Sequence, residues 1–274
     1  MTLRNSIVSP ITSQYANESL RIEESVIRPI ISPRRITTLL ACAAAFLILA
    51  GIASKYASFR LGAEGMHQYH ILGIAEQFDL DIENNISSYY QVATLMFCSL
   101  LLMLISWAKR GNRDRYYQRW RLLAFIFLLM SLDESASLHE STIEPLQKVF
   151  RLGDFFHFAW VVPAIIFVIV VAISYLPFLL SLPAGTRRMF VLAGATYVGG
   201  AVGIEIISGR LLKLYGERSP QYAAGTVVEE TLEIIGVWIF IYALLSYLSK
   251  QVKVVCVEFE GKNYSSQENV FSHE

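Results

Sequence analysis

Runs of apolar residues long enough to cross a lipid bilayer constrain this 274-residue chain more than any other feature. A membrane-spanning helix needs about 20 mostly apolar residues. Four runs meet that requirement: 36–57, 88–108, 155–182 and 189–212. Hydrophobic residues make up 54% of the chain and its mean hydropathy is +0.44, which exceeds the range of ordinary soluble domains. The chain is therefore predicted to be an all-α integral membrane protein.

Two further segments, 121–140 and 226–250, are apolar but also carry acidic residues. The positive-inside rule decides whether they span, because Lys and Arg accumulate in cytoplasmic segments. With both included, sixteen of the 23 basic residues fall on one side of the membrane and seven on the other. Leaving out either segment would move a basic cluster to the wrong side. We predict a six-transmembrane-helix bundle, polytopic, with cytoplasmic N and C termini.

The two ends of the chain fall outside this bundle. Residues 1–35 are too polar for a signal peptide and are predicted to form a mobile cytoplasmic tail. Residues 36–250 are the transmembrane domain, and 251–274 a cytoplasmic C-terminal tail. Equal numbers of basic and acidic residues give no indication of nucleic acid as a partner. The expected partners are the lipid bilayer and, through the tails, a second copy of the chain or a membrane complex.

Acidic residues gather near the outer ends of the predicted helices. Only eight of 23 lie on the inner side, so the formal charge is +8 inside and −8 outside, a field that attracts cations. Six carboxylates are predicted to share one layer: Asp133, Glu134, Glu205, Glu229, Glu230 and Glu233. Each ionised carboxylate at mid-bilayer costs about 2.5–3.5 kcal/mol. The layer therefore needs protons, a bound cation or a basic partner such as Arg210.

Helical spacing places Glu229, Glu230 and Glu233 on one face of the last span. In the segment 121–140, His139 points away from the face that carries Asp133. His139 is expected to join the acidic layer only if the helix ends or distorts before it.

Two shorter patterns add no ligands to this layer. Ala195, Gly199 and Gly203 form a stripe of small residues, which predicts close packing of that helix against another. Asp79, Asp81 and Glu83 alternate like the first ligands of a calcium loop. Asn84 stands where the turn glycine is needed and no Glu follows at the twelfth position, so an EF-hand is excluded.

Several catalytic signatures are absent from the chain. It has no Walker loop, Rossmann glycine pattern, nucleophile elbow or HExxH motif. Five histidines are too few for a histidine-box desaturase. His67 and His70 have the spacing of a ligand pair, but in a surface segment such residues more often lie at the membrane interface. The sequence leaves open whether the protein is an enzyme.

Three segments carry a resemblance to known sequences: FDLDIENN, SLDESASLHE and VVEETLEIIG. Across about residues 75–250 the chain resembles a group of uncharacterised bacterial, notably cyanobacterial, multi-pass membrane proteins. The resemblance implies no activity, and it implies a bacterial plasma (inner) or thylakoid membrane. The residues it implies as a shared pattern are Asp81, Glu83, Asn84, Asp133, Glu134, His139, Glu140, Glu230 and Glu233.

The leading hypothesis is an outward-facing, carboxylate-rich site that binds a divalent metal. Its predicted ligands are Asp133, Glu134, Glu205, Glu230, Glu233 and His139, with Glu83, Glu140, Glu229 and His157 as secondary candidates. Oxygen-rich ligation suits Mn, Fe or Ca better than Zn. The alternative is a proton-coupled or cation transporter or channel that uses the same carboxylates, although the inner halves of the helices show no polar path. The second alternative is a membrane assembly or scaffold protein.

Overall fold

The computed structural model describes residues 32–68, 72–150 and 158–251, and within these ranges the regular structure is entirely helical. The predicted tails, 1–35 and 251–274, lie almost wholly outside the described residues. The helices in chain order are α2 (Pro33–Gln68), α3 (Leu72–Glu76), α4 (Ile86–Gly111), α5 (Tyr117–Ala136), α6 (Leu138–Ser141), α7 (Ile143–Phe150), α8 (Val161–Ser181), α9 (Ala184–Val198), the π-helix η1 (Gly199–Ile204), α10 (Glu205–Tyr215) and α11 (Pro220–Gln251).

Five helical stretches among the described residues are long and apolar enough to cross a membrane: Pro33–Gly62, Ile86–Gly111, Val161–Ser181, Ala184–Tyr215 and Pro220–Gln251. The first is α2 up to its break at Gly62, and the fourth is α9, η1 and α10 taken together. The fourth predicted span therefore begins at Val161 rather than at 155, and 155–157 lie outside the described residues. The predicted span 121–140 is interrupted, because α5 ends at Ala136 and Ser137 adopts a left-handed conformation with φ 50°. With four charged residues in its 20, α5 is not among the five.

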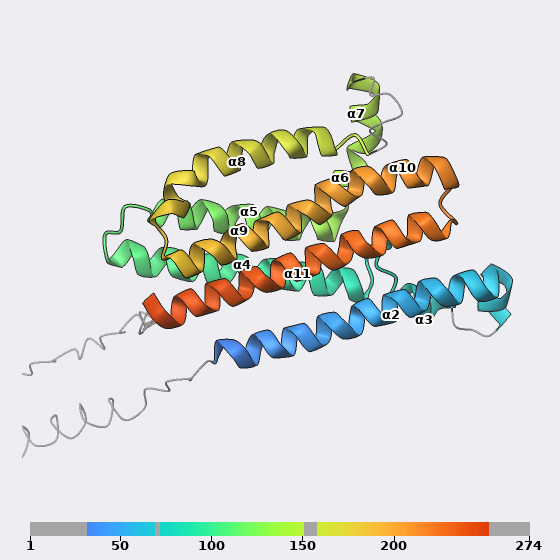
Figure 1. Ribbon diagram of the computed structural model, residues 1–274, viewed down its shortest axis with the longest axis horizontal. Helices are drawn as coiled ribbons and strands as arrows, with labels where there is room; N and C mark the ends of the chain where they lie inside the picture. The colour runs from blue at the N-terminus through green and yellow to red at the C-terminus, as the bar shows by residue number, and fades with distance from the viewer. Residues whose placement is uncertain (1–31, 69–71, 151–157, 252–274) are drawn as a thin grey trace, which may run out of the picture. The chain divides into compact units, whose positions relative to one another are not determined.

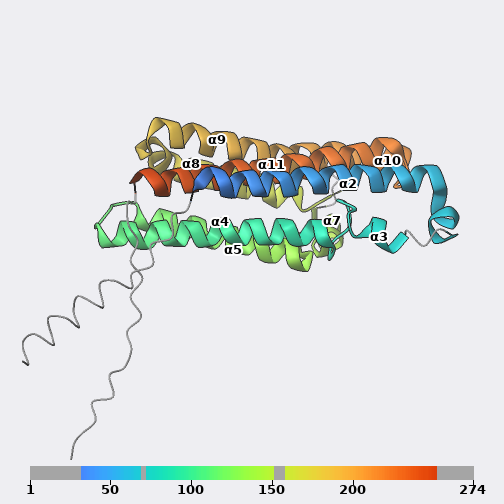
Figure 2. The ribbon, with the colours of Figure 1, turned by 90° about the horizontal axis from the view of Figure 1, so that it is seen from below.

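Three serine hydroxyls join α4 to α5 at regular intervals along both helices. Ser99 donates to the Ala124 carbonyl (2.8 Å), Ser106 to Tyr117 (2.9 Å) and Ser131 to Val92 (3.0 Å). Successive bonded positions are seven residues apart on each helix, the repeat of a left-handed coiled coil. The two helices are thus held in an antiparallel hairpin over most of their length (Figure 2).

The helix α11 lies at the centre of the packing and contacts α2, α4, α9, η1 and α10 (Figure 1). One end of this bundle, here called the basic end, is where α4 and α11 finish and α5 and α9 begin. It carries Lys109, Arg110, Arg187, Arg188 and Lys250. The opposite end, here called the acidic end, contains α3, α6 and the close of α10.

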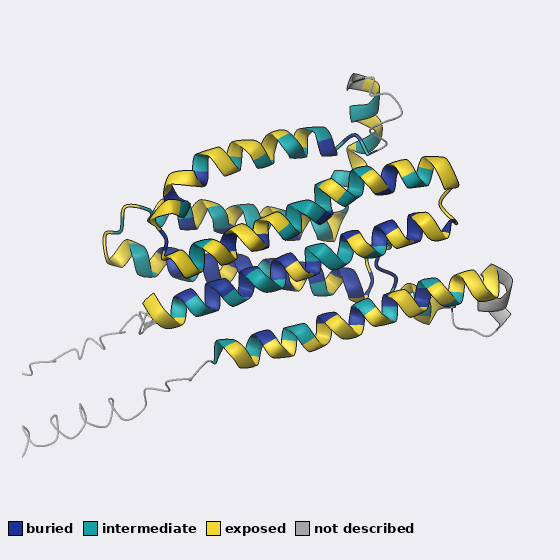
Figure 3. Ribbon diagram, in the orientation of Figure 1, coloured by how far each residue is buried: buried dark blue, intermediate teal, exposed yellow. Residues whose placement is uncertain are grey.

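Large aromatic side chains fill the core near the basic end. The Trp120 indole of α5 is 1% exposed, and its ring lies 4.9 Å from those of Phe178 on α8 and Tyr247 on α11. Further toward the acidic end, the rings of Phe127 and Phe240 stack with their centroids 4.7 Å apart. The outward faces of the spans are apolar and exposed (Figure 3), as expected of surfaces that contact lipid.

Glycines allow α11 to approach α9 and η1 closely, but they are not those of the predicted stripe. A Cβ on Gly200 would lie 2.8 Å from the Glu229 carbonyl oxygen, and one on Gly236 would lie 2.7 Å from the Tyr197 nitrogen. Gly199 and Gly203 have no such neighbour within 4 Å, so the prediction of close packing along this stripe is wrong. Residues 199–204 form a π-helix, whose wider turns rotate the following residues relative to an α-helical projection.

Candidate functional site

The carboxyl groups of α11 face the interior of the bundle near its acidic end. Glu229 is buried, and Glu230 and Glu233 are partly buried. The side-chain amide of Gln91 on α4, itself 6% exposed, donates to Oε2 of Glu230. Glu233 lies within hydrogen-bonding reach of the Tyr197 hydroxyl on α9. Each of these two carboxyl groups therefore faces a donor from a different neighbouring helix.

Glu205, at the start of α10, lies near the carboxyl groups of α11. It is the first residue after the π-helix, and its carboxyl group lies within hydrogen-bonding reach of that of Glu229. The Trp160 indole nitrogen, just before α8, donates to Glu205 Oε1 at 3.2 Å. Two carboxyl groups can form a hydrogen bond with each other only when one of them carries a proton. A hydrogen bond within this pair would therefore require a proton.

The end of α5 brings a histidine to Asp133. Because Ser137 is left-handed, the chain turns, and the His139 backbone N–H donates to Asp133 Oδ1 at 2.9 Å. The ring nitrogen Nδ1 of His139 lies 3.0 Å from Oδ2 of the same carboxylate. The ring also lies 5.0 Å from that of Trp160. The sequence predicts that His139 approaches the acidic layer only if the helix ends or distorts before this residue, and α5 does end before it.

Glu134, the neighbour of Asp133, lies near enough to Glu230 and Glu233 for direct charge interaction. We call the carboxyl groups that converge here the acidic cluster: Glu134, Glu205, Glu229, Glu230 and Glu233. They come from α5, α10 and α11. Five of the six carboxyl groups predicted to share one layer belong to this cluster, and the predicted metal site stays a prediction. Carboxylates this close in a medium of low dielectric require protons or a bound cation to offset their mutual repulsion.

A second group of charges lies in the turn before α4. Lys55 on α2 pairs with Asp79 at 2.8 Å and with Asp81 at 3.1 Å. Asn85 caps α4 through a reciprocal pair of bonds with Ser88 and also donates to the Asp79 carbonyl. The FDLDIENN segment therefore joins α2 to α4 by charge pairing and capping. The candidate Glu83 lies in this turn and is partly buried.

Other candidates do not enter the described arrangement. His70 and His157 lie outside the described residues, and the side chains of His67 and Glu140 are not described. Within the part of the chain that is described, no group of three or more His, Cys, Asp or Glu side chains is placed to hold a metal ion.

Sequence reasoning missed the donors of the site: Gln91, Tyr197 and Trp160. Only Gln91 carried a usable signal, as an amide within the otherwise apolar run 88–108. Beyond Glu233 the interior becomes apolar, with Val237, Ile241 and Leu244 buried on α11. Apolar side chains of α11 thus lie between the acidic cluster and the basic end.

Comparison with known proteins shows a match over most of the chain. The family described as "Domain of unknown function (DUF8692)" matches residues 38–248. No curated protein and no solved structure matches the chain. The matched region includes all of the acidic cluster and its donors.

Proposed function

We propose that this chain, which belongs to the DUF8692 family, is a membrane protein that binds and releases protons at the acidic cluster as part of proton-coupled transport. One observation carries the proposal: the carboxyl groups of Glu205 and Glu229 lie close enough for a hydrogen bond, which two carboxyl groups form only when one of them holds a proton. The surrounding donors support it, because Gln91, Tyr197 and Trp160 hold separate carboxyl groups in place. Ionisable residues within membrane helices commonly mark such pathways.

The proposal includes six spans, cytoplasmic termini and a bacterial plasma or thylakoid membrane. The serine bonds at three levels support α5 as a span in addition to the five apolar ones, since they align it with α4 over most of its length. The excess of Lys and Arg at the basic end supports a cytoplasmic location for that end. The acidic cluster then faces outward.

This topology can be tested by labelling single cysteines introduced at Thr142 and Asn112, both of which are exposed, in a chain without its native cysteines. A membrane-impermeant maleimide added to intact cells is expected to label position 142 and not position 112. Labelling of 112 alone would overturn the orientation, and labelling of both would overturn the count of spans.

A divalent metal (Mn, Fe or Ca) is the second candidate occupant. It is favoured by the convergence of Glu134, Glu230 and Glu233 from two helices. Carboxylate oxygens are suitable ligands for these metals. Because these groups are not arranged as a ligand set, a metal would require their side chains to move.

Infrared spectroscopy and elemental analysis of the purified full-length protein separate the two occupants. We expect a carboxylic-acid C=O band at neutral pH that weakens in the Glu205→Gln variant. The matched control is Glu144→Gln, which removes a carboxylate that is exposed and paired with Lys148. Stoichiometric metal that disappears in a Glu230→Gln, Glu233→Gln double variant, with no such band in the wild type, would overturn the proton proposal and establish the metal.

Transport itself is tested in proteoliposomes with an imposed pH gradient. Wild-type protein is expected to dissipate the gradient faster than the Glu230→Gln, Glu233→Gln variant, while Glu144→Gln behaves as wild type. Equal rates for all three proteins would contradict proton-coupled transport and leave only proton binding.

A further inference from the structure

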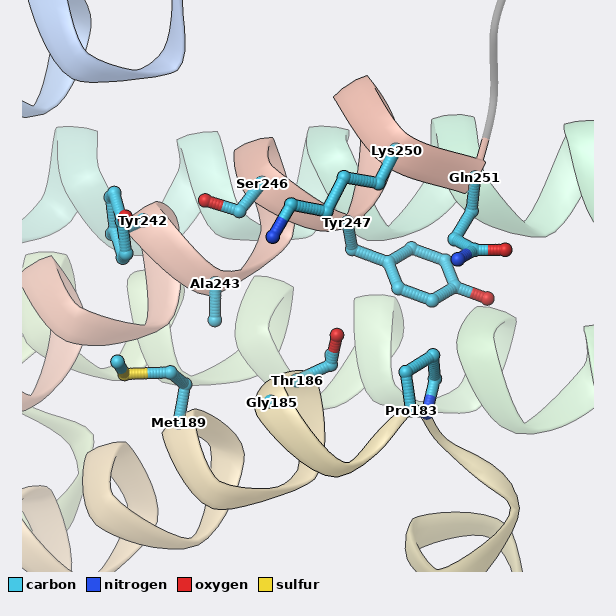
Figure 4. Close-up of a pocket in the computed structure, with 10 residues that line it drawn as sticks. All are labelled: Pro183, Gly185, Thr186, Met189, Tyr242, Ala243, Ser246, Tyr247, Lys250 and Gln251. Atoms are coloured by element: carbon cyan, nitrogen blue, oxygen red, sulfur yellow. The ribbon is translucent and has the colours of Figure 1, made fainter.

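A cavity of about 240 Å³ lies at the basic end of the bundle, between the first turns of α9 and the last turns of α11 (Figure 4). This volume is many times that needed for one water molecule, so a polyatomic ligand fits. It is separate from the acidic cluster, because Tyr242, the lining residue of α11 nearest to Glu233, lies about two and a half turns beyond it. Nothing in the proposed function accounts for it.

The described residues that line the cavity combine one cation with several neutral polar groups. Lys250 supplies the ammonium, Thr186 and Ser246 supply hydroxyls, and Gln251 supplies an amide. Figure 4 shows the Lys250 and Thr186 side chains directed from opposite helices toward the space between them. Among the described residues that line the cavity there is no Asp or Glu. Such a set of donors with a single positive charge is suited to an anion with several oxygen atoms.

The start of α9 strengthens this preference. Thr186 lies in the first turn of that helix, which contains no acidic residue and receives no side-chain cap from Pro183. The positive end of the helix dipole therefore faces the cavity without a competing carboxylate.

The position of the cavity identifies the source of the anion. Both helices that form it are among the five able to cross a membrane, and the cavity lies where they end. Membrane phosphates occupy that level, and basic pockets between spans bind lipid headgroups there. Met189 at the edge of the cavity is 37% exposed, and Leu192 one turn further along α9 is 51% exposed. An apolar surface thus continues from the cavity along the helix, where acyl chains would lie.

We propose that this cavity binds the phosphate of an anionic membrane lipid, with Lys250 and Thr186 as its principal ligands and the acyl chains lying along α9. Inorganic phosphate shares the headgroup chemistry but lacks the apolar part. A lipid is therefore expected to bind where free phosphate does not.

Native mass spectrometry of the full chain in a neutral detergent tests this with three probes: phosphatidylglycerol, phosphatidylcholine with the same acyl chains, and inorganic phosphate. Wild-type protein is expected to retain phosphatidylglycerol in preference to the other two. Lys250→Gln is expected to weaken its binding about tenfold, the value of one charge-assisted hydrogen bond. Thr186→Val is expected to weaken binding by a smaller factor.

Arg110→Gln is the matched control, since Arg110 also lies in the last turn of a helix at the basic end, is exposed and does not line the cavity. It is expected to bind as wild type. An equal loss in this control would overturn the proposal in favour of unspecific charge attraction. Unchanged binding by Lys250→Gln, or equally tight retention of inorganic phosphate, would overturn it as well. Thermal unfolding without added lipid checks that each variant is folded.

Discussion

Between Glu229 and Glu233 the helix α11 presents carboxyl groups to its neighbours, whereas from Val237 to Leu244 it buries apolar and aromatic side chains. The two stretches belong to one continuous helix. The apolar stretch is stabilised by packing area, which is spread over many contacts and is insensitive to charge. The carboxylate stretch depends on individual donors, each of which leaves a buried acceptor without a partner when it is lost. Stability should therefore be concentrated toward the basic end, and chemistry toward the acidic end.

The largest loss of stability is expected from Trp120→Ala, at the centre of the aromatic core. Its ring contacts those of Phe178 and Tyr247, and the side chain is 1% exposed. Removing it should lower the free energy of unfolding by about 3–5 kcal/mol, through lost contacts and the cavity left behind. Unfolding by SDS in mixed micelles measures this. Trp107→Ala, at a site that is 63% exposed, is the control and should change little. Similar losses for both would contradict a core at the basic end.

Gln91→Leu tests the opposite half, because it removes the donor to Glu230 without greatly changing side-chain volume. The expected loss is about 1.5–3 kcal/mol, the range for hydrogen bonds to charged groups. Combining it with Glu230→Gln in a double-mutant cycle should show non-additivity, since the two residues form one interaction. Strict additivity of the two changes would indicate that the contact makes no energetic contribution.

Gly236→Ala tests whether close approach of α11 and α9 joins the two halves. The added methyl group would lie 2.7 Å from the backbone nitrogen of Tyr197, so the helices must separate. A loss of about 1–3 kcal/mol is expected from overpacking. Gly194→Ala on α9 is the matched control, because it has no neighbour within 4 Å and gains helix propensity. If Gly236→Ala also weakened the infrared band assigned to the acidic cluster, the two halves would be coupled through this contact.

Features that are local to a single helix could be predicted from the sequence. The apolar runs and the common face of Glu229, Glu230 and Glu233 are local properties of a helix, and both were predicted. The condition for His139 was also correct, because a break in the helix is the only local way to reverse its direction. The six-helix count stays a prediction, since α5 is too charged to stand out by hydropathy.

The remaining features depend on how helices meet. No spacing within 88–108 indicates that Gln91 faces Glu230, which lies 139 residues away along the chain. Gly199 and Gly203 do not make the close contact predicted for them, whereas Gly200 makes one within a π-helix. Irregular turns of this kind are set by tertiary packing and leave little trace in the residue pattern.

The smallest loss of stability is expected where α4 meets α5, because the three serine hydrogen bonds there join neutral groups. These bonds are spread from the acidic end to the basic end. Interhelical hydrogen bonds within membranes average about 0.6 kcal/mol. Ser131→Ala near the acidic end and Ser106→Ala near the basic end should each cost about that amount. The two sites share no partner, so the double variant should lose the sum. Ser249→Ala, exposed at the end of α11, is the control. A much larger loss at Ser131 alone would show that the α4–α5 pairing mainly supports the acidic cluster, and would make this helix pair part of the site.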